Sequence, residues 1–203
     1  MGTQERYKTI LMFGEPGSGK GTQGKILGDL PGFFHLSCGD VFRALKLSSE
    51  LGKTFLEYSS KGELVPDNFT VQLWLEHIHR LVQTHQFHPE EEILVLDGIP
   101  RNRHQAEMME TYIDVALLLY LEASDEEELI HRMRRRALHD NRLDDANEAV
   151  IRNRFRAYEA ETAPVLDYYP PELIRKVDAN QTPIEVLKGV IWNVEQVAEM
   201  EVA

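Results

Sequence analysis

The chain has 203 residues, and its 22 lysines and arginines against 34 aspartates and glutamates give a formal net charge of −12. This length is typical of one domain, and 42% hydrophobic with 28% charged residues is a globular composition. The acidity argues against general binding to nucleic acid or to an anionic membrane, and no apolar run approaches the roughly 18 residues of a membrane span.

Short apolar runs typical of buried strands alternate along the chain with longer helical stretches. We expect strands over residues 9–13, 34–37, 93–96, 115–121 and 173–177. We expect helices over residues 20–30, 40–47, 53–61, 67–85, 125–137, 147–167 and 183–198. Strands separated by helices pair in parallel, so this order predicts an α/β three-layer sandwich with a five-stranded parallel sheet. A ligand would bind beyond the carboxyl ends of the strands.

A glycine-rich segment, GEPGSGKGT at residues 14–22, follows the first expected strand directly and opens a helix. Its glycines allow backbone N–H groups to surround phosphate oxygens, and the helix N-terminus adds a positive dipole end. In the general pattern Ser or Thr follows the lysine directly, whereas here Gly21 stands between Lys20 and Thr22. The segment predicts a phosphate-loop NTPase fold. Lys20 can place its ammonium against the β- and γ-phosphates of a nucleotide.

Eight of the 14 arginines fall between Arg132 and Arg156. A charge run alone is more often a solvated helix face. In an acidic protein, however, such a concentration also fits a site for a small, highly anionic ligand.

Cys38 is the single cysteine of the sequence. One cysteine excludes an internal disulfide and a zinc site made of several cysteines. The polar residues 1–8 lack the apolar stretch of a signal peptide. We therefore expect a cytoplasmic protein that holds no zinc and in which Cys38 is buried and inert.

From GKGTQ at residues 19–23 onward, the chain resembles the nucleoside monophosphate kinases and, among them, the adenylate kinases. Four further stretches match motifs of that family in the same order: LSCGDVFR at 36–43, KGELVPD at 61–67, LDGIPRNRHQA at 96–106, and NRLDD with RNRFRAYEAETAPVLDYY at 141–145 and 152–169. The resemblance spans nearly the whole chain. It implies one kinase domain over residues 1–203, with an acceptor-binding insertion at about 36–66 and a short lid at about 137–143.

The activity that the resemblance implies is reversible transfer of the γ-phosphoryl group of Mg-ATP to AMP, giving two ADP, in nucleotide homeostasis. Its partners would be ATP and AMP, without nucleic acid or membrane, and we expect a monomer. Mg²⁺ would arrive with ATP and would be held through water by Asp97 and Asp40 rather than by direct ligands.

Phosphoryl transfer needs positioning and neutralisation of charge, for which the paired donors of arginine are suited. The resemblance gives catalytic roles to Lys20, Arg132, Arg136, Arg142 and Arg154. It gives ATP binding to Arg132 and Arg136 and to six residues of the phosphate loop, Gly17, Ser18, Gly19, Lys20, Gly21 and Thr22. It gives AMP binding to Ser37, Cys38, Arg43, Gly62, Leu64, Val65, Gly98, Arg101, Gln105, Arg142 and Arg154, with Gln105 reading the adenine.

Several positions depart from the family pattern. Cys38 stands where adenylate kinases usually have threonine and pyrimidine-nucleotide kinases have alanine, and Asn102 also favours the pyrimidine type. Gln105 favours adenine. A UMP/CMP kinase is therefore the alternative enzyme, and a catalytically silent nucleotide-binding module is the alternative of another class.

One extra residue stands before Arg154 relative to the family, so Arg152 would take its role if the helix is out of phase. Glu15 is an acid within the phosphate loop, and we expect its side chain to point away from the phosphates.

Overall fold

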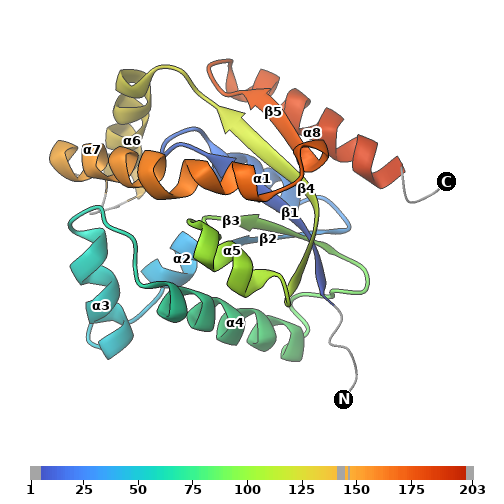
Figure 1. Ribbon diagram of the computed structural model, residues 1–203, viewed down its shortest axis with the longest axis horizontal. Helices are drawn as coiled ribbons and strands as arrows, with labels where there is room; N and C mark the ends of the chain where they lie inside the picture. Colours follow the sequence, from blue (N-terminus) through green and yellow to red (C-terminus); the bar gives the residue numbers. More distant parts are fainter. Residues whose placement is uncertain (1–5, 141–144, 146, 200–203) are drawn as a thin grey trace.

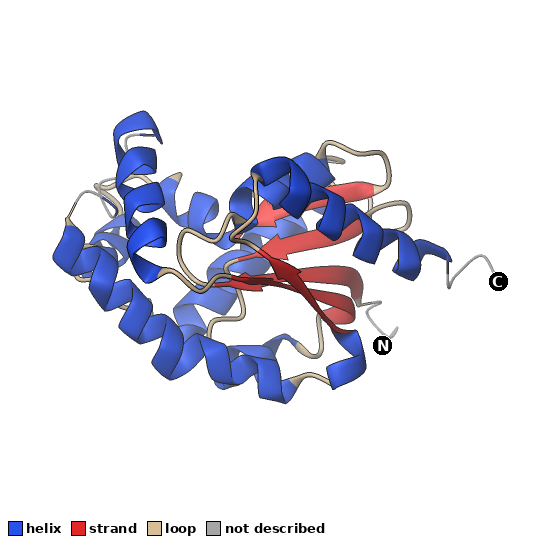
Figure 2. Cartoon of the chain, turned by 90° about the horizontal axis from the view of Figure 1, so that it is seen from above, coloured by secondary structure: helices blue, strands red, loops and turns tan. Residues whose placement is uncertain are grey.

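The computed structural model describes residues 6–140, 145 and 147–199. Five strands form one parallel sheet in the order β2-β3-β1-β4-β5, with helices on both faces (Figures 1 and 2). The strands are β1 (Tyr7–Gly14), β2 (Phe33–Ser37), β3 (Ile93–Asp97), β4 (Ile113–Glu122) and β5 (Ile174–Asp178). The predicted α/β sandwich with a five-stranded parallel sheet is confirmed.

Eight α-helices and three short turns lie among the described residues. The helices are α1 (Lys20–Gly28), α2 (Cys38–Arg43), α3 (Glu50–Ser59), α4 (Asp67–Gln83), α5 (Arg103–Met109), α6 (Glu126–Asp140), α7 (Glu148–Ala157) and α8 (Pro183–Glu199). A π-helical turn, η2 (Tyr158–Thr162), is followed by the 3₁₀ turns η3 (Ala163–Tyr168) and η4 (Pro171–Leu173). No described helix combines the length and the apolar character needed to cross a membrane.

The central strand β1 is buried on both faces, as expected for a parallel sheet covered by helices. Ile10 and Met12 point to one face and Leu11 and Phe13 to the other, because strand side chains alternate. The first face packs on α1 and α8 through Leu27, Val186 and Val190. The second packs on α4, α5 and η3 through Trp74, Ile78, Met109 and Val165.

A separate apolar cluster joins α6 to α7. Its buried members are Leu129, Ile130, Met133, Ile151 and Phe155. Because the cluster holds these helices together through their apolar faces, it also fixes where the arginines on their other faces point. These two helices carry most of the arginine run.

The sequence-based prediction of one helix over residues 147–167 was wrong. The α-helix ends at Ala157, widens into η2 and then tightens into η3. Pro164, in the first turn of η3, has no N–H and would clash with an α-helical turn before it, so the α-helix cannot continue.

The short helix α5 was not predicted, because its seven residues, RHQAEMM, hold no extended apolar period. Of the expected lid at 137–143, residues 137–140 continue α6, and 141–143 lie outside the described residues.

Helix α1 lies close to β2 because it carries glycine where the two elements meet. A Cβ built on Gly24 would lie 2.6 Å from Cδ2 and from Nε2 of the His35 ring. The His35 Nε2 atom is buried, so the ring has little room to retreat.

We expect Gly24→Ala to lower the free energy of unfolding by about 1–3 kcal/mol, because the added methyl overpacks this contact. In a His35→Ala background the same change should stabilise by up to about 1 kcal/mol, because alanine is the better helix former. Denaturant unfolding of the four proteins of this cycle checks both values. An equal cost in both backgrounds would show that the contact does not set the helix position.

Candidate functional site

A cavity of about 970 Å³ opens at the carboxyl edge of the sheet. The phosphate loop, residues 14–22, follows β1 there, and Asp97 ends the adjacent strand β3 opposite Met12. Ser37 ends β2 beside Asp97. Parallel strands thus bring three separate motifs to one edge, as the topology predicts.

Every predicted site residue that the structure describes lines this cavity. From the phosphate loop come Gly17, Ser18, Gly19, Lys20, Gly21 and Thr22. From the rest of the chain come Ser37, Cys38, Asp40, Arg43, Gly62, Leu64, Val65, Asp97, Gly98, Arg101, Gln105, Arg132, Arg136 and Arg154. Arg142 lies outside the described residues.

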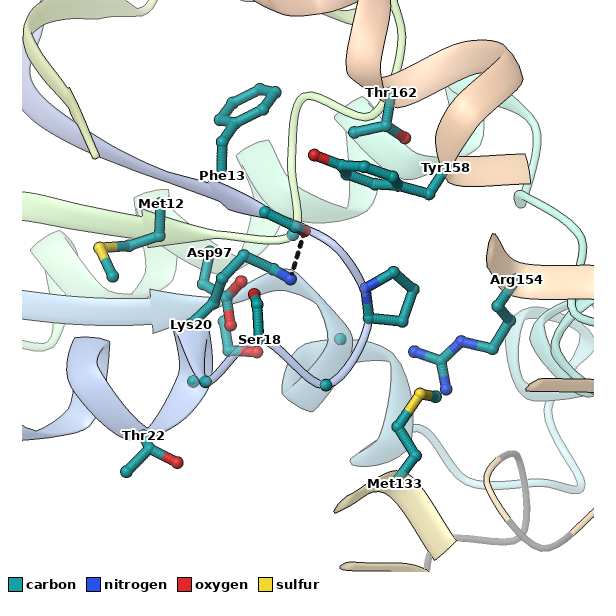
Figure 3. A pocket seen from close by; sticks show the side chains of 18 of the residues that line it. Met12, Phe13, Ser18, Lys20, Thr22, Asp97, Met133, Arg154, Tyr158 and Thr162 are labelled. Atoms are coloured by element: carbon teal, nitrogen blue, oxygen red, sulfur yellow. Dashed lines mark hydrogen bonds between the residues drawn. The ribbon is translucent and has the colours of Figure 1, made fainter. Parts of the chain in front are cut away.

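The phosphate loop is held in place by its own backbone and by α6. Gly17 has a φ of +86°, and a Cβ on it would lie 2.9 Å from the Leu129 carbonyl oxygen, so a side chain has no room there. Lys20 Nζ donates hydrogen bonds to the carbonyl oxygens of Gly14 at 2.7 Å and Glu15 at 2.9 Å. Figure 3 shows the Lys20 side chain with one hydrogen bond drawn from its ammonium group. The lysine side chain is therefore anchored to the start of the loop that carries it.

Lys20 lies where positive charges converge. Burial lowers the pKa of Lys20 to about 8; the carboxylate of Asp97 opposes this shift, whereas Arg101, Arg136 and Arg154 add to it. Because each of these arginines penalises another positive charge, an anionic group bound among them would stabilise the ammonium form.

A buried carboxylate ties the two arginine-bearing helices together. Asp145 has no exposed surface and accepts hydrogen bonds at Oδ2 from Arg136 Nε and Nη2, at 2.9 and 2.5 Å. Its Oδ1 accepts from Arg154 Nη1. Arg136 comes from α6 and Arg154 from α7, and Figure 3 shows Arg154 reaching toward the phosphate loop. One carboxylate thus holds both guanidinium groups at the cavity wall.

Two arginines on the β2–β3 side are fixed by short local contacts. Arg43 Nη2 donates to Asp40 Oδ1 at 2.5 Å, and Arg101 Nε donates to the Gly98 carbonyl oxygen at 2.9 Å. Thr162 Oγ1 donates to the Arg101 carbonyl oxygen at 2.7 Å, which links Arg101 to the π-helical turn η2. Both guanidinium groups are therefore already oriented before a phosphate binds.

The loop between α3 and α4 is docked on α7. Asn153 Nδ2 donates to the Lys61 carbonyl oxygen at 2.6 Å. A Cβ on Gly62 would lie 2.6 Å from the Val150 carbonyl oxygen and 3.1 Å from Arg154 Cγ, so glycine permits this approach. This docking brings the loop next to the Arg154 side chain.

The wall near this loop combines apolar and polar groups. Phe42 and Phe55 stack with ring centroids 5.1 Å apart and line the cavity with Leu64 and Val65. Gln105 is 1% exposed. Its Oε1 accepts a hydrogen bond from the Arg101 backbone N–H, and its Nε2 donates one to Asp67 Oδ1. A flat base would find apolar contact and an amide edge here. The phenylalanines were not predicted as site residues, although Phe42 directly precedes Arg43 in the motif.

The opposite end of the cavity is formed by α6 and the turn before α8. Arg132 Nη1 donates to the Ala179 carbonyl oxygen at 3.0 Å, and its Nε donates to Glu128 Oε1 at 3.1 Å. Gln23 Nε2 donates to the Pro183 carbonyl oxygen at 3.2 Å. These contacts join α1, α6 and the 179–183 turn around one wall.

The geometry distinguishes the arginines that the sequence left ambiguous. Arg152 pairs with Glu126, Glu127 and Glu148 on the surface, whereas Arg154 faces the cavity, so the helix phase favours Arg154. Arg135, which was not predicted from the sequence as a site residue, is exposed and also lines the cavity. Its position within the arginine run was the available signal.

Glu15 and Asn102 also have clear positions. Neither is among the described residues that line the cavity. Burial, followed by the carboxylates of Glu159 and Glu126, raises the pKa of Glu15. The Asn102 side chain caps the N-terminus of α5 by accepting from the Gln105 N–H at 2.8 Å. Asn102 therefore contributes here to helix capping.

Among the described residues, no three His, Cys, Asp or Glu side chains are grouped as a metal site. Asp97, which is 8% exposed, lies at the carboxyl end of β3, and its Oδ2 would be 3.4 Å from a Cβ on Gly21. One carboxylate beside a phosphate loop fits a Mg²⁺ ion that keeps water and phosphate oxygens as its main ligands.

Comparison with known proteins points to one family. A sequence model of the adenylate kinase family matches residues 12–173. Adenylate kinases of Flavobacterium psychrophilum and Thermobifida fusca are 37% and 38% identical to this chain, over 79% and 84% of its length and 83% and 89% of theirs. The adenylate kinase of Porphyromonas gingivalis is 40% identical over 79% of this chain and 81% of its own.

Cys38 should be unreactive in the native protein. Burial raises the pKa of its thiol to about 12, an effect that the nearby Arg101 only partly offsets. At pH 8 an aromatic disulfide reagent should label the native protein at least about a hundredfold more slowly than the protein in guanidinium, because the thiolate is the reacting form. The absorbance of the released thiol measures both rates. Labelling of the native protein as fast as the unfolded one would contradict the buried position.

Proposed function

The chain belongs to the adenylate kinase family, and from this we propose that it reversibly transfers the γ-phosphoryl group of Mg-ATP to AMP, giving two ADP, in nucleotide homeostasis. The enzyme is a nucleoside monophosphate kinase. The observation that supports the proposal best is the cavity of about 970 Å³ that joins the phosphate loop, six described arginines and Gln105.

The donor would lie along the phosphate loop. Backbone N–H groups of residues 17–22 and the ammonium of Lys20 would hold the ATP phosphates, with the dipole of α1 behind them. Arg132, fixed to the Ala179 carbonyl oxygen, would cover the donor base side. The turn at 179–183 completes that wall.

The acceptor would lie on the β2–β3 side. Arg43 and Arg101 would grip the α-phosphate of AMP. The base would enter between Val65, the Phe42–Phe55 pair and Gln105, which supports the role of residues 36–66 as an acceptor-binding insertion.

Transfer would occur between the two sites without a side-chain nucleophile. An oxygen of the AMP phosphate attacks the γ-phosphorus of ATP, and the bond from that phosphorus to the β,γ-bridging oxygen breaks to release ADP. Arg136 and Arg154, held by Asp145, would neutralise the charge that spreads over the moving group. Arg142 would join them, as the family motif implies.

Mg²⁺ bound with ATP would supply further charge neutralisation at the β- and γ-phosphates. Asp97, with Asp40, would accept hydrogen bonds from the water around such an ion, and both residues line the cavity. The chain's own part is then to orient that water shell. We also propose that the protein is a cytoplasmic monomer with a short lid at 137–143.

The alternative enzyme is a UMP/CMP kinase. Cys38 lines the cavity and keeps this alternative open, whereas the capping role of Asn102 removes one argument for it. A catalytically silent nucleotide-binding module would bind ATP without turnover.

Steady-state phosphotransfer with Mg-ATP and a panel of AMP, CMP, UMP and GMP tests the proposal. We expect kcat/KM for AMP to exceed that for each other acceptor by at least about a hundredfold, because Gln105 reads the base edge. ATP turnover without an acceptor is the control and should be negligible, because hydrolysis needs water in the closed site. Preference for CMP or UMP would identify the pyrimidine alternative, and binding without transfer would identify the silent module.

A further inference from the structure

Asp67, the first residue of α4, makes contacts that a helix N-terminal acid does not need. Its Oδ1 accepts hydrogen bonds from Gln105 Nε2 and from Asn102 Nδ2, each at 2.8 Å. Both partners lie at the start of α5, more than thirty positions along the chain. Asp67 is not among the described residues that line the cavity, so it can act on a ligand only through Gln105.

The contacts fix which way the Gln105 amide faces. A carboxylate can only accept a hydrogen bond, so the group facing Asp67 must be Nε2. On the other side the Arg101 backbone N–H donates to Oε1 at 2.8 Å, and a backbone N–H cannot accept. The two neighbours therefore impose the same orientation, and a flipped amide would lose both hydrogen bonds.

The hydrogen-bonding groups of Gln105 that remain unused present a donor and an acceptor in one fixed order. One N–H of Nε2 and one lone pair of Oε1 are used internally, which leaves one donor and one acceptor for the cavity that Gln105 lines. An amino base such as adenine presents an N–H donor beside a ring-nitrogen acceptor, which matches this pattern. The corresponding oxo base presents an acceptor beside an N–H donor, in the opposite order.

The fixed order of donor and acceptor on Gln105 selects between bases only if the bound base cannot flip and present its edge in reverse. Arg43 and Arg101 would anchor the acceptor phosphate, so the base reaches Gln105 in one orientation, and an oxo base would meet donor against donor. We propose that Asp67 is a positioning residue that fixes the Gln105 amide and thereby selects amino over oxo bases in the acceptor. This inference rests on the proposed function.

The test compares AMP with IMP, which carries the same phosphate and sugar on the corresponding oxo base. In Asp67→Ala we expect KM for AMP to rise and the AMP-to-IMP ratio of kcat/KM to fall, each roughly tenfold, because a freed amide can present either order. The KM for ATP should not change. Asp67→Asn keeps an acceptor oxygen in the same place and should restore most of the ratio.

Glu50→Ala is the matched control, because Glu50 is an exposed acid in the first turn of α3. It removes a helix N-terminal charge without a contact to Gln105 and should leave the ratio unchanged. If Asp67→Ala does not fold, Asp67→Ser takes its place, since serine suits a helix start but is too short to reach both amides.

The outcomes separate this inference from the proposed function. An unchanged AMP-to-IMP ratio in the Asp67→Ala enzyme, even with a lowered unfolding temperature, would reduce Asp67 to a structural residue and overturn the inference alone. A wild-type enzyme that prefers CMP would overturn the proposed acceptor, and the CMP-to-UMP ratio would then test Asp67 through the same amino-to-oxo change. Loss of discrimination in Asp67→Ala with recovery in Asp67→Asn supports the inference.

Discussion

The convergence of positive charge around Lys20 is the constraint on which the rest of this structure depends. A chain of net charge −12 places a lysine and several arginines around one cavity, where burial and neighbouring guanidinium groups lower the pKa of that lysine to about 8. Such a cluster is stable because its members hold internal anions and carbonyl oxygens. Asp145 joins two helices through Arg136 and Arg154, and Asp40 holds Arg43. These contacts also orient the guanidinium groups before any ligand binds, which would remove part of the entropic cost of the proposed transfer.

The parallel sheet makes this convergence possible. Because β1 and β3 are adjacent and end at the same edge, the phosphate loop and Asp97 lie next to each other and no long loop is needed to bring them together. Alternating apolar side chains bury both faces of the sheet, so its edge is a rigid base for the loops. Glycine then allows the close approaches, of Gly17 to α6 and of Gly62 to α7, that bring helices from the far side of the cavity against these loops.

Much of the site could be predicted from the sequence, because its motifs follow expected strands and parallel strands end at one edge. The hydrogen-bond and ion-pair partners of the charged groups could not be predicted from the sequence. Asp145 lies nine positions from both Arg136 and Arg154, and Asp67 lies 38 from Gln105, distances at which pairing depends on how helices pack. The break after Ala157 was also missed: apolar spacing continues through it, and the backbone widens into a π-turn before Pro164. Short α5 starts from the Asn102 cap rather than from an apolar period.

Charge stabilisation without a phosphorylated side chain requires both nucleotides to occupy the cavity at once. Initial rates measured over a range of Mg-ATP concentrations at several fixed AMP concentrations test this requirement directly. Double-reciprocal lines that intersect are the predicted result, because transfer then proceeds from a ternary complex. Parallel lines would mean that ADP leaves before AMP binds, so that the protein itself carries the phosphoryl group. That result would contradict a site built from Lys20 and arginines to hold two nucleotides together.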